Sequence, residues 1–123
     1  MDKDTPRAVL DWERFKDWLS HSVHLTHHQL HVLVGLLLFV LAARVLRRPL
    51  ASPLPLVPVA VLEAGNEGFD FARYYSSGWP WTAHATLVDI ALTLAPPAAL
   101  MIAARMTTAL RRRVAPAVND GEG

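Results

Sequence analysis

The sequence contains no cysteine among its 123 residues. This absence excludes disulfide bonds and metal sites built on thiolates. The GxSxG, HExxH and phosphate-loop patterns of common hydrolases, metalloproteases and nucleotide-binding proteins are also missing. The net charge is only +1, because 12 Lys and Arg residues nearly balance 11 Asp and Glu residues. This balance gives no reason to expect a nucleic-acid partner, and the missing motifs leave open whether the protein is an enzyme.

The chain has room for only one small domain, yet 52% of its residues are hydrophobic. The first twenty residues are rich in acidic side chains, whereas a cleavable signal peptide starts with a short basic stretch followed by an apolar one. We therefore expect the first hydrophobic segment to be a retained membrane anchor.

Residues 1–24 are expected to form an amphipathic helix that lies at the membrane surface. Thr5 and Pro6 make a good helix start, because a hydroxyl can cap the first turn and proline suits the first helical position. Apolar residues then recur at helical spacing, with charged residues on the opposite face. The apolar residues are Trp12, Phe15, Leu19 and Val23. The alternative is that this face packs on a soluble partner.

Residues 25–106 are expected to form three transmembrane helices, which makes the fold class an all-α membrane protein. The first span, residues 27–46, reaches roughly the 20 residues that a helix needs to cross a bilayer. The second span is predicted at residues 55–75 and the third at 83–105. Residues 107–123 are expected to form a basic cytoplasmic tail.

The arginines predict the orientation of these spans. Basic clusters follow the first and third spans, and such clusters favour the cytoplasmic side of a membrane. They comprise Arg44, Arg47, Arg48, Arg105 and Arg111 to Arg113. We therefore expect a multi-pass protein of the bacterial inner (plasma) membrane, with its N-terminus outside and its C-terminus in the cytoplasm.

Four acidic residues lie inside the hydrophobic segments. Glu63, Glu67 and Asp70 share a helical face through their i, i+4, i+7 spacing, and Asp89 is the fourth. A charge near the centre of a bilayer costs roughly 2.5 to 3.5 kcal/mol, so such residues persist where they face a partner, a cavity or a ligand. With a rise of about 1.5 Å per residue, Glu67, Asp70, Asp89 and His31 fall at similar depth in the outer half of the membrane.

Histidines on the first span add to this polar layer. The i, i+4, i+7 spacing of His24, His28 and His31 predicts one imidazole-bearing helix face. Asn66 and Arg73 flank the acidic face of the second span. The candidate ligand-binding residues are therefore His28, His31, Glu63, Asn66, Glu67, Asp70, Arg73 and Asp89.

Three interpretations of the polar layer compete. Histidine and carboxylate suit zinc, manganese or iron, and an i, i+4 pair such as His27 and His31 can share one ion. Because the spacing matches no stringent motif, a bound divalent metal stays open without being predicted. In the second interpretation, Arg73 holds an anionic group such as a lipid head group, while the acids and imidazoles exchange protons or hold a cation. In the third, the layer only fixes the register of the helices or docks the protein to an assembly.

A stripe of small residues on the second span supports the docking alternative. Small side chains let membrane helices approach closely, and here they recur at i, i+4, i+8 and i+12. They are Ala60, Ala64, Gly68 and Ala72. The leading hypothesis is thus an envelope protein whose polar pocket binds a membrane lipid. The alternative is a non-catalytic accessory subunit that contacts other membrane subunits through this stripe. A proton or ion path is weakened because residues 91–104 carry almost no ionisable side chain.

In their order along the chain, these polar segments resemble the VanZ-like family of small bacterial membrane proteins. That family shows a His near the start of a membrane helix, a Glu followed by an amide or acidic residue, an outer-loop Arg, and an Asp opening the last helix. The matching segments here are residues 27–31, residues 63–70 with Arg73, and residues 89–94. The family's Asp-Lys before the His is missing, and members commonly have an extra membrane helix. The resemblance implies a role in the cell envelope and no defined reaction.

Overall fold

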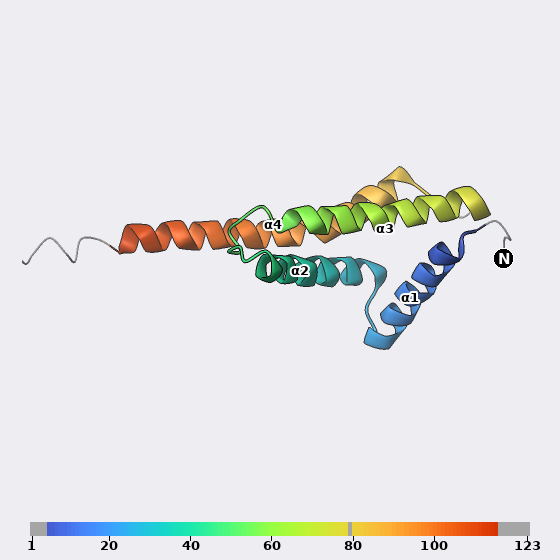
Figure 1. Ribbon diagram of the computed structural model, residues 1–123, viewed down its shortest axis with the longest axis horizontal. Coiled ribbons are helices and arrows are strands. Elements are labelled where there is room, and N and C mark those ends of the chain that lie inside the picture. Colours follow the sequence, from blue (N-terminus) through green and yellow to red (C-terminus); the bar gives the residue numbers. More distant parts are fainter. Residues whose placement is uncertain (1–4, 79, 116–123) are drawn as a thin grey trace, which may run out of the picture.

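The computed structural model describes residues 5–78 and 80–115. Within these ranges the chain is helical and contains no strand, which confirms the all-α class. Residues 1–4 of the predicted surface helix, Trp79 and residues 116–123 of the predicted tail lie outside the described residues. The four helices are α1 (Arg7–Val23), α2 (His27–Val45), α3 (Leu56–Ser77) and α4 (Ala83–Val114) (Figure 1).

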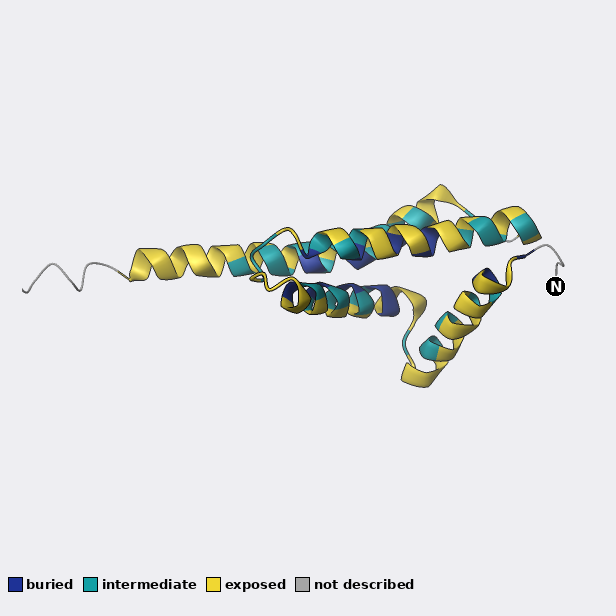
Figure 2. Ribbon diagram, viewed as in Figure 1, coloured by how far each residue is buried: buried dark blue, intermediate teal, exposed yellow. Residues whose placement is uncertain are grey.

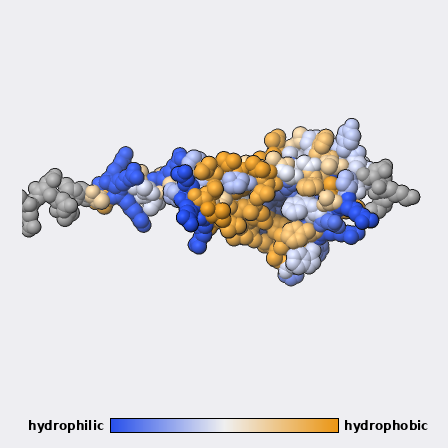
Figure 3. All heavy atoms as spheres, viewed as in Figure 1, coloured by the Kyte–Doolittle hydropathy of each residue, from blue (hydrophilic) through white to orange (hydrophobic). Residues whose placement is uncertain are grey.

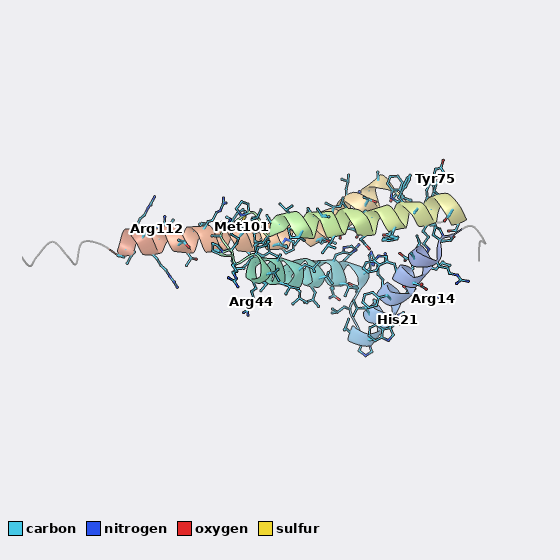
Figure 4. All side chains as sticks on the ribbon, viewed as in Figure 1. Arg14, His21, Arg44, Tyr75, Met101 and Arg112 are labelled. Carbon is cyan, nitrogen blue, oxygen red and sulfur yellow. The ribbon has the colours of Figure 1, made fainter. Side chains whose placement is uncertain are left out.

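Helices α2, α3 and α4 lie side by side, and α4 packs against both of the others. Helix α1 leaves the bundle at an angle and contacts α3 near one end of the molecule (Figure 1). Because the chain reverses after α2 and again after α3, the start of α2, the end of α3 and the start of α4 meet at the α1 end. The opposite half of α4 extends beyond its neighbours and is exposed, including Arg112 (Figures 2 and 4).

Hydroxyl side chains start two of the helices. Thr26 and Gln29 form a capping box on α2: the Thr26 hydroxyl accepts the Gln29 N–H, and the Gln29 side chain accepts the Thr26 N–H. Thr82 caps α4 in the same way through the Ala85 N–H, at 3.1 Å. The predicted cap at Thr5 is wrong, because α1 begins at Arg7 without a side-chain cap. The Thr5 hydroxyl instead accepts a hydrogen bond from Ser76 at the end of α3.

The predicted bounds of the three segments agree with those of α2, α3 and α4 except at the end of α4. Helix α4 does not end near Arg105 but continues through the arginines to Val114. No helix-breaking residue lies between Arg105 and Val114, whereas Pro116 disfavours the helical conformation for Ala115. The first part of the predicted tail is therefore an extension of the last helix.

Two of the helices, α2 and α4, are long and apolar enough to cross a membrane. Only 28% of the most apolar window of α2 and 17% of that of α4 are buried inside the protein, so most of this surface faces outward. Figure 3 shows the result as an apolar band between more polar ends. Helix α3 carries three acidic residues and Arg73 and does not meet the same criterion.

Gly35 sets the distance between α2 and α4. A Cβ atom at this position would lie 2.2 Å from the carbonyl oxygen of Thr93, which is far too close for any side chain. Around this crossing the side chains of Phe39, Val59 and Pro97 are fully buried. The glycine therefore lets two helix backbones touch at the centre of the bundle.

We expect Gly35→Ala to lower the thermal stability of the protein in detergent, because its methyl group would force α2 and α4 apart. Overpacking of this kind costs about 1–3 kcal/mol. Gly65→Ala is the matched control, since its Cβ meets nothing within 4 Å and alanine favours a helix. Unfolding followed by circular dichroism measures both variants, and equal melting temperatures would contradict the close approach.

Candidate functional site

The α1 end of the bundle holds a cluster of buried polar side chains from three helices. Five of the predicted site residues belong to it, and each has less than a tenth of its surface exposed. These five residues are His31 on α2, Glu63, Asn66 and Glu67 on α3, and Asp89 on α4. Thr93, one turn beyond Asp89, is also buried and was not predicted. The antiparallel packing of α2, α3 and α4 thus gathers residues that are far apart in the sequence.

His31 lies at the centre of this cluster. Its Nδ1 atom is 2.9 Å from the hydroxyl of Thr93, which itself donates a hydrogen bond to the carbonyl oxygen of Asp89. The hydroxyl proton is therefore used, so Thr93 must accept from Nδ1–H. Glu63 Oε1 lies 3.3 Å from the same Nδ1 and makes an electrostatic contact there. When the ring is neutral, this arrangement leaves Nε2 as a hydrogen-bond acceptor on the other side of the ring.

The partner of His31 is His27, which was not among the predicted site residues. The two Nε2 atoms are 3.1 Å apart, and both face the carboxylate of Asp89, at 3.4 Å from His27 and 3.8 Å from His31. Their i, i+4 spacing was visible in the sequence, but the predicted face ran through His28 and His24 instead. His28 is exposed. His24 ends α1 in a left-handed conformation and does not lie on α2, so the prediction of one face with His24 is wrong.

Helix α1 is held to α3 by three polar contacts. Trp12 Nε1 donates to Asn66 Oδ1 at 2.9 Å, Lys16 binds Asp70, and Arg73 binds Glu13. Lys16 also forms an ion pair with Glu13 within α1. Arg14 of α1 takes no part in these contacts; it is exposed and points away from α3 (Figure 4).

These contacts pair Asp70 and Arg73 with α1, and both residues also line the polar cavity described below. Both residues belong to an ion-pair network that covers the buried cluster. The network residues on α1, Glu13 and Lys16, were not predicted. Each helix carries an acid followed three residues later by a base, Glu13 and Lys16 on α1 and Asp70 and Arg73 on α3, and this matching pattern was visible in the sequence.

Two cavities adjoin beneath α1. The first, about 360 Å³, is polar: five carboxylates, Lys16, Arg73, His27 and His28 contribute to its wall. The second, about 260 Å³, is mostly apolar and is lined by Trp12, Phe15 and aliphatic side chains of α2, with the buried polar cluster at its wall. Lys16 and His27 border both cavities. A polar chamber and an apolar groove thus meet at one place.

No protein-family model matches the chain, and no curated protein and no solved structure matches it either. The resemblance to the VanZ-like family therefore rests on its short motifs alone.

The ion pairs of Lys16 give α1 docking a pH dependence. Burial lowers the pKa of Lys16, but its bonds to Asp70 and Glu13 outweigh this effect and raise the pKa above its ordinary value. A raised pKa in the folded state means that the stabilisation is complete below the unfolded pKa and is lost as the pH rises through the folded one. We expect α1 to detach in alkaline solution, above the ordinary lysine pKa of about 10.5.

The emission maximum of Trp12, with the other three tryptophans replaced by phenylalanine, measures this detachment. Lys16→Met should weaken docking at neutral pH and remove the alkaline step. Lys3→Met is the matched control, since Lys3 is the only other lysine. An alkaline step of equal size in Lys16→Met would contradict the role of this ion pair.

Proposed function

We propose that the protein is a small bacterial inner-membrane protein of the cell envelope that binds the polar head of a membrane lipid. The observation that carries this proposal is the meeting of the two cavities, one polar and one apolar, at Lys16 and His27. An amphiphile needs both environments at once: a hydrogen-bonding chamber for its head and an apolar groove for part of its chain. The apolar outer surface of α2 and α4 would bring such a ligand within reach.

In this proposal α3 also crosses the membrane, in addition to α2 and α4. Its 22 residues span about 33 Å at the rise of an α-helix, which is enough for a hydrocarbon core of about 30 Å. At the end of the bundle opposite the cavities, Arg105 donates a hydrogen bond to the carbonyl of Ala51. The arginine clusters after α2 and on α4 thus lie on one side, which supports a cytoplasmic location for that end. The cavities and α1 then lie at the outer face, where the exposed Phe15 and Trp18 suit an interface.

The charges of the polar cavity narrow the choice of head group. Its carboxylates outnumber its cations, and Arg73 is already bound to Glu13. A purely anionic head would have to break that ion pair and lie among carboxylates. A zwitterionic head fits better, because its ammonium can pair with the carboxylate of Glu67.

We expect Glu67→Ala to reduce the binding of a zwitterionic phospholipid by about tenfold or more, because the ammonium would lose a buried partner. Native mass spectrometry of the purified protein, titrated with the lipid in mild detergent, measures the bound fraction. Asp11→Ala is the matched control, since Asp11 is an exposed acid on α1. Equal lipid binding by both variants would contradict the proposed pocket, as would a wild-type chain that binds no lipid.

One observation favours the second candidate, a non-catalytic accessory subunit. The middle of the small-residue stripe is not covered by this chain: Ala64 and Gly68 are exposed, and a Cβ atom at Gly68 would meet nothing within 4 Å. A helix face of this kind suits close packing against another membrane helix.

If a partner subunit packs on this stripe, Gly68→Leu should release it and leave the fold of the isolated chain intact. Leu37→Trp, at an exposed position on α2, serves as the control for added bulk elsewhere. The mass of the native complex extracted from the membrane gives the result. An unchanged assembly in Gly68→Leu would rule out this face, and a monomeric wild-type protein would rule out the subunit itself.

A further inference from the structure

We propose that His27, His31 and Asp89 form a binding site for a single divalent transition-metal ion, with Zn²⁺ as the best fit. His27 and His31 come from the first turns of α2 and Asp89 from α4. Their ligand atoms all lie within 4.8 Å of one another. The site is thus built between two helices whose separation is fixed by the backbone contact at Gly35.

The distances between these atoms are near those of a tetrahedral ion, although slightly open. Zinc binds imidazole nitrogen and carboxylate oxygen at about 2.0–2.2 Å, which places neighbouring ligand atoms about 3.3–3.6 Å apart in a tetrahedron. The two Nε2 atoms are 3.1 Å apart, Asp89 Oδ2 lies 3.4 Å from that of His27, and Asp89 Oδ1 lies 3.8 Å from that of His31. One ligand atom from each residue lies within 4.8 Å of the others, so an ion at the common centre would draw the Asp89 carboxylate and the exposed His27 ring inward.

The proton positions favour a cation at this centre. Thr93 fixes the proton of His31 on Nδ1, so the Nε2 lone pair points at the shared centre. Metal-binding histidines show the same pattern: the second ring nitrogen donates to an oxygen, which holds the ring in place. Glu63 adds a carboxylate 3.3 Å from this Nδ1 and supports the positive charge that a bound metal places on the ring.

The fourth position of the ion would open into the polar cavity, because His27 and Asp89 both line that cavity while His31 is buried behind them. Three protein ligands with one open position are typical of metal sites that bind an exchangeable water or ligand. An oxygen-bearing ligand in the cavity could therefore reach the ion. The metal site itself does not depend on the lipid proposal, since it needs only side chains of this chain.

The test is a titration of the purified protein with ZnCl₂ alone, in detergent and against a chromophoric chelator. The protein is isolated through an affinity tag without histidine and stripped of metal beforehand. We expect one Zn²⁺ per chain, and at least about tenfold weaker binding in His27→Ala. His27 is exposed, so this variant should keep the fold, which circular dichroism verifies. Substitution of Co²⁺ should give the intense visible bands of a tetrahedral site, and these bands should be lost in the same variant.

His84→Ala is the matched control, since His84 is an exposed histidine at the same end of the bundle and outside the cluster. It should bind Zn²⁺ as the wild-type protein does. Thr93→Val tests the supporting contact, and we expect it to weaken binding about 10- to 100-fold without removing a ligand. Absence of stoichiometric Zn²⁺ binding by the wild-type chain would overturn the proposal, as would equal binding by His27→Ala. Because lipid is left out, a failure here is distinct from a failure of the lipid-binding proposal.

Discussion

Polar side chains that leave water need partners inside the protein, since an unpaired buried charge or hydrogen-bonding group is costly. The bundle buries an imidazole, two glutamates, an aspartate, an asparagine and a threonine within a small volume. Each of them therefore constrains its neighbours: Thr93 orients His31, His31 orients Glu63 and Asp89, and Asn66 takes the indole N–H of Trp12. The positions of α1, α2, α3 and α4 relative to one another follow from satisfying this cluster at one end and packing apolar side chains at the other.

The backbone makes this cluster possible through Gly35. Contact between the α2 backbone and the carbonyl of Thr93 brings the first turns of α2 close to the start of α4. A larger residue would separate the two helices, and His31 would lose both Thr93 and Asp89. Close packing and polar chemistry are thus one constraint here, because the same residue, Thr93, takes part in both.

The sequence predicted the helices well, because their signals are local. The apolar runs that marked the spans lie within single segments, and the caps at Thr26 and Thr82, which were not predicted, also act within the first turn of their helices. Two local signals were misleading. Thr5 offered a cap but bonds Ser76 instead, and the end of α4 was placed at the first arginine although arginine favours a helix.

The sequence allowed us to predict which kinds of side chain form the candidate site, but not which of them contact one another. Acidic residues in apolar segments marked α3 and α4 correctly as the source of buried carboxylates. Which histidine faces them depends on where α2 begins: His31 is buried and His27 reaches Asp89 from the exposed rim, whereas His28 has no contact with Asp89 among those described. The contacts between α1 and α3 span more than fifty residues of sequence. No helical period along one segment could have predicted them.

The balance of charge in the polar cavity argues for a bound cation. Five carboxylates line or close it, and Lys16 and Arg73 compensate those nearest α1. Asp89 lies deeper, and its ion-pair partners among the described residues are the imidazoles of His27 and His31. If those imidazoles stay neutral, the charge of Asp89 is unpaired in an apolar bundle, which is the costly case. A divalent ion held by Asp89, His27 and His31 removes this cost and leaves a positive centre facing the cavity. That centre would attract the phosphate of a head group, whose ammonium would lie near Glu67. The acidic lining that opposes a simple anion thus becomes compatible with a zwitterionic lipid once the metal is bound.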